Sequence, residues 1–201
     1  MKSWLSTCRL PILVLGLAMI CIPIAAYGQS TEIAITTGGN FVSNGNFNMG
    51  TTWALQGSVA HRFFQSSGLE TGRLQLYGEL PIAVGKGSSR SATPGGPLVN
   101  TLSPEIASIF VTPGVKVKLN VPMVAPYFVV GIGAGHFYAA GFSGETHPVF
   151  SYGTGADFNL SSHFALRGEV RDYNSPIPKI AFGGSGRQHN FFVTGGVVFR
   201  F

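Results

Sequence analysis

Cysteine is nearly absent from the chain, and its two copies, Cys8 and Cys21, both lie in the first segment. If this segment is removed, the remaining chain has no disulfide, no thiolate nucleophile and no thiolate metal site. Charge is also scarce, since Asp, Glu, Lys and Arg make up 10% of the residues, against about 25% in an ordinary soluble domain. The basic residues form no stripe of the kind that phosphate backbones require, so we expect no nucleic-acid partner.

The first segment, 1–28, predicts a secretory signal peptide. Its start is basic, an uncharged apolar run follows over 10–26, and small residues stand at Ala26 and Gly28. This order is typical of a cleaved signal, and we place the cleavage after Gly28. A retained transmembrane helix is the alternative, which the two prolines in this segment and its short apolar run disfavour. We therefore expect a mature domain over 29–201 that is exported across the inner membrane.

Helical periodicity is missing from the rest of the chain. Apolar and polar residues alternate instead in eight runs, which clusters of Gly, Asn, Ser and Pro separate. This pattern is typical of β-strands joined by turns, and the 28 glycines and 12% aromatic residues suit an all-β membrane protein. The predicted strands span about 31–39, 51–64, 72–84, 105–118, 124–138, 149–159, 163–172 and 190–201.

The predicted connections alternate between long and short, at about 11, 7, 20, 5, 10, 3 and 17 residues. Outer-membrane barrels combine long outer loops with short periplasmic turns. If the first strand starts in the periplasm, the long connections all face outward. A soluble sandwich has no reason to sort its connections in this way.

The charged residues of the mature chain avoid the centres of the apolar strand faces. A Lys or Arg that faces lipid at mid-depth costs about 2–4 kcal/mol, so this avoidance has a physical cause. Alternation alone would also suit a soluble sandwich with a polar outside. The other charges, Asp172 and Arg187 among them, are predicted in connections or at strand ends. The charges predicted to form a paired network inside the barrel are Glu32, Arg62, Arg73, Glu79, Lys116, Lys118, Asp157, Arg167, Glu169, Arg171 and Arg200.

For the predicted strand at 124–138, the sequence does not determine which residues face lipid and which face the interior. Phe128, Val130 and Ile132 would face lipid, and three glycines would face a narrow interior. That register also places His136 on the lipid face.

Five features carry a resemblance to a known family: the segments 73–81, 111–118, 126–135 and 163–172, and the terminal Phe201. Through them the chain resembles the small eight-stranded outer-membrane barrels of the OmpA/OmpX type, over essentially all of 29–201. The resemblance implies an antiparallel up-and-down transmembrane β-barrel in the bacterial outer membrane. It also implies that Phe199 and Phe201 form the signal read by the outer-membrane assembly machinery. It says little about activity, because such barrels serve as anchors, adhesins, lipid enzymes and receptors.

We expect a monomeric, non-enzymatic anchor without a cofactor, whose outer loops meet a surface ligand. Membrane lipid and lipopolysaccharide are its expected neighbours, and Lys86 and Arg90 could meet lipopolysaccharide phosphates. A narrow ion channel is one alternative, in which an excess of basic residues would favour anions.

A lipid A-modifying enzyme is the other alternative. The residues that come closest to a Ser–His–acid triad are Ser185, His189 and Asp172, and the sequence around Ser185 has no recognisable nucleophile elbow. No two histidines have the i and i+2 spacing that would place them on one strand face, so no metal site is predicted. A pairing of His147 with His189 in the outer loops stays open.

Overall fold

The computed structural model of the chain describes residues 30–43, 48–66, 73–88, 105–139, 143–178 and 186–201. The predicted signal peptide and its cleavage site lie outside these ranges. Among the described residues, no helix is long and apolar enough to cross a membrane. The strands are β1 (Thr31–Ser43), β2 (Asn48–Gln65), β3 (Arg73–Ser88), β4 (Glu105–Val111), β5 (Gly114–Asn120), β6 (Val124–Ala139), β7 (Glu145–Asn159), β8 (Phe164–Pro176) and β9 (Arg187–Arg200).

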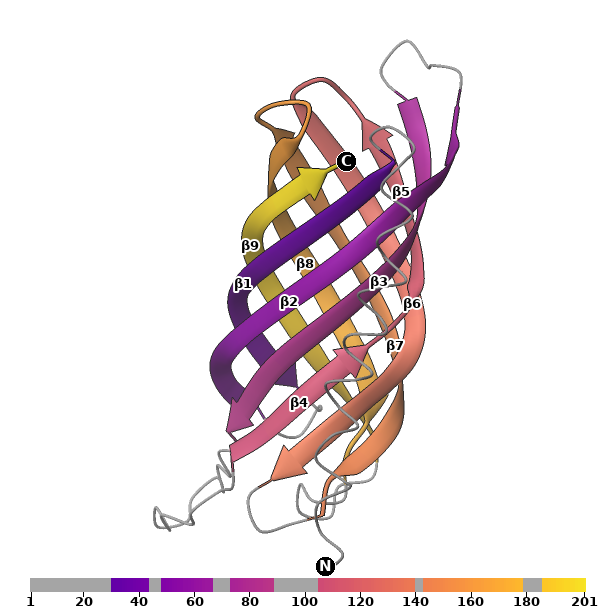
Figure 1. The fold of residues 1–201 in the computed structure, drawn as a ribbon. Helices are drawn as coiled ribbons and strands as arrows, with labels where there is room; N and C mark the ends of the chain where they lie inside the picture. The colour runs from indigo at the N-terminus through magenta and orange to yellow at the C-terminus, as the bar shows by residue number, and fades with distance from the viewer. Residues whose placement is uncertain (1–29, 44–47, 67–72, 89–104, 140–142, 179–185) are drawn as a thin grey trace, which may run out of the picture.

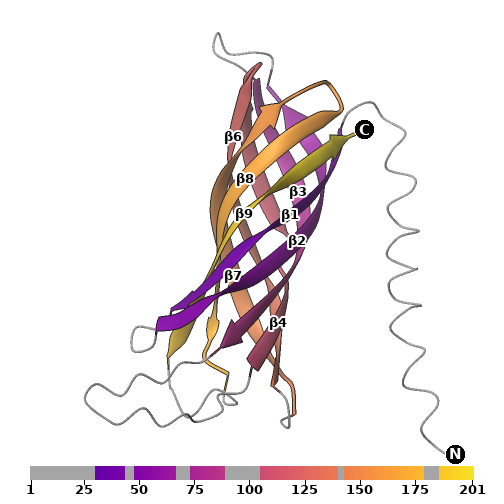
Figure 2. The same cartoon turned by 90° about the vertical axis from the view of Figure 1, so that its left-hand side faces the viewer.

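These strands close into one antiparallel barrel (Figures 1 and 2). Consecutive strands pair with one another except for β4 and β5, which each pair with β3 and β6, and β1 also pairs with β9, so the first and last strands seal the sheet. The predicted up-and-down architecture is confirmed. We call the end where β1 begins and β9 finishes, at the top of Figure 1, the turn end, and the opposite end the loop end.

The wall has eight positions although nine strands are recognised, because β4 and β5 share one position between β3 and β6. The sequence predicted one strand over 105–118, and this detail is wrong. Pro113 has no N–H and cannot continue the ladder at that point. Its carbonyl still accepts a hydrogen bond from the Ile132 N–H at 3.1 Å, so the wall stays closed there.

The strands reach further toward the loop end than predicted. The connections at that end shrink to 44–47, 89–104, 140–144 and 177–186, while those at the turn end are 66–72, 121–123 and 160–163. The predicted alternation of long and short connections is therefore wrong at the first connection, 44–47, which is shorter than the second, 66–72. The Asn and Gly residues on both sides of this connection predicted a turn. In the structure these residues belong to β1 and β2, which pair as far as Ser43 and Asn48. Pairing in the sheet overrides local propensity here.

Apolar side chains cover the outside of the barrel, whereas the inside holds the paired charges, other polar side chains and one buried apolar cluster. In β6, Phe128, Val130 and Ile132 are exposed, and Ile132 reaches 70%. Gly131 and Gly135 face inward, which settles the register that the sequence left open. A Cβ at Gly135 would lie 2.8 Å from a ring carbon of Phe110, so the glycine makes room for that ring. Because the polar face points inward, a soluble sandwich with a polar outside is excluded.

Exposed aromatic residues mark two levels on the outer surface. Phe63, Phe158, Phe164 and Phe201 lie near the turn end, and Phe41, Trp53, Tyr138 and Phe191 lie nearer the loop end. The ten residue steps from Phe191 in β9 to Phe201, which directly follows β9, span about 26 Å along the axis, at ~3.4 Å per residue and a ~40° tilt. Outer-membrane barrels carry an apolar band of about 25 Å between two aromatic girdles. The two levels therefore fit the two membrane interfaces.

The apolar band generates a first prediction. Val170 is an outward residue of β8, 46% exposed, between the two levels. We expect Val170→Arg to lower the free energy of unfolding by about 2–4 kcal/mol, because it exposes a charge to hydrocarbon. The measurement is the urea midpoint of protein refolded in lipid vesicles. Leu160→Arg is the matched control, since Leu160 is 68% exposed in the 160–163 turn; equal losses in both variants would contradict the assignment.

Candidate functional site

A network of paired charges fills the interior toward the turn end. At its centre lies Glu32 of β1, whose side chain is 2% exposed. Its carboxylate accepts hydrogen bonds from Nζ of Lys116 at 3.1 Å, Nε of Arg200 at 3.2 Å and Nη2 of Arg167 at 3.5 Å, and Lys118 also donates to it. One carboxylate from the first strand thus binds cations from β5, β8 and β9. Removing a partner from such a buried group leaves uncompensated charge.

Asp157 of β7 is the second acceptor in this layer, and it is fully buried. Arg167 donates to it through Nε at 2.8 Å and Nη2 at 3.0 Å, a bidentate geometry. Lys118 Nζ lies 2.6 Å and Arg200 Nη2 lies 3.3 Å from the same carboxylate. Since Glu32 and Asp157 share these cations, the layer ties opposite sides of the barrel together.

A second layer lies closer to the middle of the barrel. Arg171 lies 3.0 Å from Glu79 and 2.8 Å from Glu169. Glu169 also accepts hydrogen bonds from the Tyr127 hydroxyl at 2.5 Å and the Gln56 amide at 2.7 Å. Glu169 therefore connects the charge pairs of this layer to the neutral side chains of Tyr127 and Gln56.

The structure brings nine of the eleven predicted interior charges into these two layers. The other two lie toward the turn end, where Arg62 is half-buried and Arg73 is exposed. Sequence reasoning missed Tyr127, whose ring lies 4.8 Å from the Arg167 guanidinium. Its inward position follows from the β6 register, which the sequence left open.

The two residues of the predicted assembly signal face outward at the turn end. The ring of Phe199 packs against that of Phe164, with centroids 4.9 Å apart, and Phe201 is 48% exposed. Recognition by the assembly machinery stays a prediction.

An aromatic cluster closes the interior on the loop-end side of the charge network. Phe110 stacks on Tyr173 with centroids 4.8 Å apart, and Phe137 and Phe192 meet Phe110 edge-on. All four rings are at most 1% exposed. The Tyr173 hydroxyl donates to Gln56 at 2.8 Å and so joins the cluster to the charge network. Side chains therefore fill the described interior at two successive levels.

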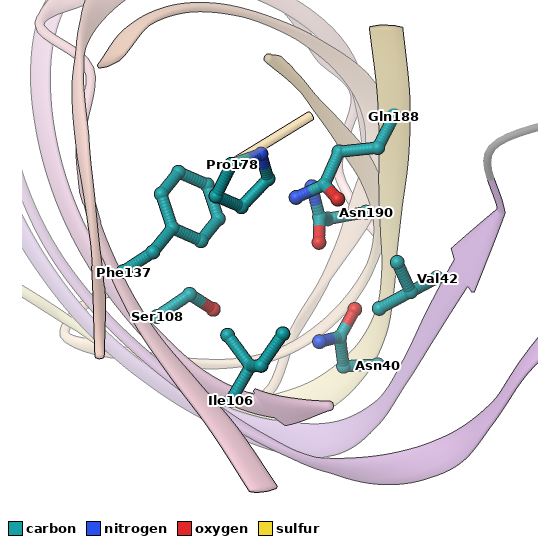
Figure 3. A pocket seen from close by; sticks show the side chains of 8 residues that line it. All are labelled: Asn40, Val42, Ile106, Ser108, Phe137, Pro178, Gln188 and Asn190. Atoms are coloured by element: carbon teal, nitrogen blue, oxygen red, sulfur yellow. The ribbon is translucent and has the colours of Figure 1, made fainter. Parts of the chain in front are cut away.

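The loop end holds an uncharged recess, seen from close by in Figure 3. The Asn40 amide donates to the Lys86 carbonyl at 3.4 Å, whereas its Oδ1 is buried with no hydrogen-bond partner among the described residues. The carboxamides of Gln188 and Asn190 lie close together on one side of the recess. The lining residues are Asn40, Val42, Ile106, Ser108, Phe137, Pro178, Gln188 and Asn190.

A third polar group lies on the outer wall. Asp172 was predicted in a connection or at a strand end, but β8 continues to Pro176 and carries this residue on its outward face. Its carboxylate accepts hydrogen bonds from the His189 ring at 2.5 Å and from the Asn190 N–H at 3.1 Å, and Tyr152 of β7 is its neighbour in the strand pairing. The Asp172 side chain is only 1% exposed.

Two further side chains extend this outer cluster, which consists of Tyr152, Asp172, Asn174, Arg187 and His189. Arg187 Nε donates to the side-chain oxygen of Asn174, and Arg187 Nη2 lies 3.4 Å from the Asn174 carbonyl. The Asn174 amide nitrogen lies 3.0 Å from Nδ1 of His189. Polar side chains of β7, β8 and β9 thus form one continuous group on the outside of the barrel.

The structure separates the two histidines whose pairing stayed open. His147 contacts Glu145 at 3.0 Å within β7, whereas His189 contacts Asp172 on the outer wall. Ser185, the serine of the hydrolase alternative, lies outside the described residues. Within the described ranges, no group of three or more His, Cys, Asp or Glu side chains could hold a metal ion.

Comparison with solved structures supports the barrel fold. No protein family model and no curated protein sequence matches the chain. The solved structure of neisserial surface protein A has a TM-score of 0.52 at 12% identity, over 85% of this chain and 97% of that one. Ail of Yersinia pestis has a TM-score of 0.49 at 14% identity, over 87% and 99%. The outer membrane enzyme PagL has a TM-score of 0.47 at 11% identity, over 83% and 98%.

The charge network generates a second prediction. We expect Glu32→Gln to destabilise the barrel by about 3–5 kcal/mol, because buried cations lose their central partner. The control is Glu145→Gln, which removes a carboxylate that is 25% exposed and should cost less than about 1 kcal/mol. Urea unfolding of the refolded barrel measures both. Similar stability of the two variants would show that Glu32 does not hold the network together.

Proposed function

We propose that the chain is a bacterial outer-membrane barrel of the OmpA/OmpX type that anchors a surface-exposed loop end and is neither a channel nor an enzyme. One observation carries this proposal: the closed wall is apolar outside, while its charges are paired inside. Only a hydrocarbon surrounding favours this inverted arrangement. The fold shared with a neisserial surface protein agrees with such a location.

The loop end is the outward end in this proposal. The two longest connections, 89–104 and 177–186, lie there, and the two shortest at the opposite end are 121–123 and 160–163. Outer-membrane barrels place short turns in the periplasm. The recess at the loop end would then face the outside of the cell, where it is accessible to a surface ligand.

Cysteine labelling tests this orientation, because the chain has no cysteine after Cys21. Ser143 and Ser162 are both exposed, and they lie at opposite ends of the barrel. We expect Ser143→Cys to react with a membrane-impermeant maleimide on intact cells. Ser162→Cys should react only after the outer membrane is permeabilised. The reverse result would invert the orientation, and absence of both variants from the outer-membrane fraction would reject the location.

The filled interior argues against the channel alternative. Arg171, Lys116 and Lys118 are almost fully buried, as are Phe110 and Tyr173 on their loop-end side. An eight-stranded barrel has an interior just wide enough for side chains. An ion would have to displace paired charges and then the packed rings.

Planar-bilayer recording provides the fourth prediction. We expect no stable conductance steps from the purified protein at any applied voltage, because side chains block the interior at two levels. A porin incorporated in the same bilayer controls for insertion. Reproducible single-channel steps from the wild-type protein would establish the channel instead.

The enzyme alternative has one supporting feature, the contact between His189 and Asp172. Nucleophilic hydrolysis also needs a hydroxyl or thiol within reach of the imidazole. No hydroxyl of a serine or threonine bonds to His189 in the part of the chain that the structure describes. The non-enzymatic reading therefore remains our proposal.

A further inference from the structure

We propose that the outer cluster binds the phosphate of an outer-leaflet lipid. This inference rests on the membrane location proposed above, and it gives that location a specific lipid contact. The cluster is formed by side chains of β7, β8 and β9 on the lipid-facing side of the wall.

The first argument is the height of the cluster. Asp172 lies opposite Tyr152 on one side and opposite Phe191 on the other in the strand pairing. Phe191 belongs to the aromatic level nearer the loop end, about 26 Å from Phe201. Aromatic girdles lie at the depth of the lipid headgroups. The cluster is therefore placed beside headgroups rather than beside the acyl chains.

The second argument is the polarity that the cluster presents. The carboxylate of Asp172 is covered, at 1% exposure, whereas the His189 side chain is 39% exposed and Arg187 is exposed. Among the described residues, Arg187 contacts no carboxylate and donates to Asn174. The hydrogen-bond acceptor of the cluster, the Asp172 carboxylate, is therefore buried, whereas its cationic donor, the Arg187 guanidinium, is exposed. The complementary ligand is an anion, and guanidinium groups suit phosphate oxygens by geometry and charge.

The third argument is the apolar surface next to the cluster. Val170 and Val193 are paired neighbours, each 46% exposed, and they lie on the turn-end side of Asp172 and Phe191. A lipid whose phosphate meets Arg187 would lay its acyl chains along these side chains toward the middle of the membrane. A free phosphate ion could make only the first of these contacts.

Native mass spectrometry tests the proposal on protein purified from membranes of cells that express the full chain. We expect detergent-solubilised protein to retain added phosphatidylglycerol and not diacylglycerol, which has the same chains without the phosphate. Arg187→Gln should reduce the retained fraction about tenfold, as expected for loss of a charge-assisted hydrogen bond. Arg73→Gln is the matched control, since Arg73 is exposed at the turn end, and it should change nothing.

Three results would overturn the proposal. Equal losses in both arginine variants would show unspecific attraction, and equal retention of diacylglycerol would show apolar adhesion. Displacement of the lipid by millimolar inorganic phosphate would make the site one for a free anion. Heat-modifiable migration of each variant on gels shows that it is folded. The assay is carried out in detergent, so a failed location in cells is distinguishable from a failed lipid site.

Discussion

The separation of buried charge from surrounding hydrocarbon is the constraint on which this barrel depends. Glu32 and Asp157 bind cations from three other strands, and no single hairpin could satisfy them. The network therefore forms only when the barrel closes, because its partners come from β1, β5, β7, β8 and β9. Closure in turn leaves the apolar side chains outside, where only lipid can cover them.

The same constraint organises the rest of the interior. Charge pairs fill the region near the turn end, Gln56 and Tyr127 extend them with neutral hydrogen bonds, and the aromatic cluster of Phe110 and Tyr173 follows. The polarity thus falls from ionic to neutral to aromatic before the recess opens at the loop end. This order gives the recess a rigid floor, since Phe137 belongs both to the aromatic cluster and to the recess lining.

The period-2 alternation of the sequence was enough to predict the architecture and the facing of most strands. It could not predict which charges would meet, because the contact between Glu32 and Lys118 joins residues far apart in the chain. Strand ends were also missed, since the turn-forming residues near Ser43 pair when a neighbouring strand supports them. Pro113 interrupts one ladder without changing which faces point inward, so the alternation concealed the break.

Asp172 is the exception to the alternation of apolar and polar residues, because it places a carboxylate on the apolar outward face of β8. A carboxylate on the outward face of a membrane strand is costly unless donors cover it. The structure supplies those donors from the His189 ring and the Asn190 N–H. A purely structural wall would need no such group, since an apolar residue would fit the position without donors. The covered carboxylate instead holds His189 beside Asn174 and Arg187, so the exception to the pattern is also what organises the polar outer cluster.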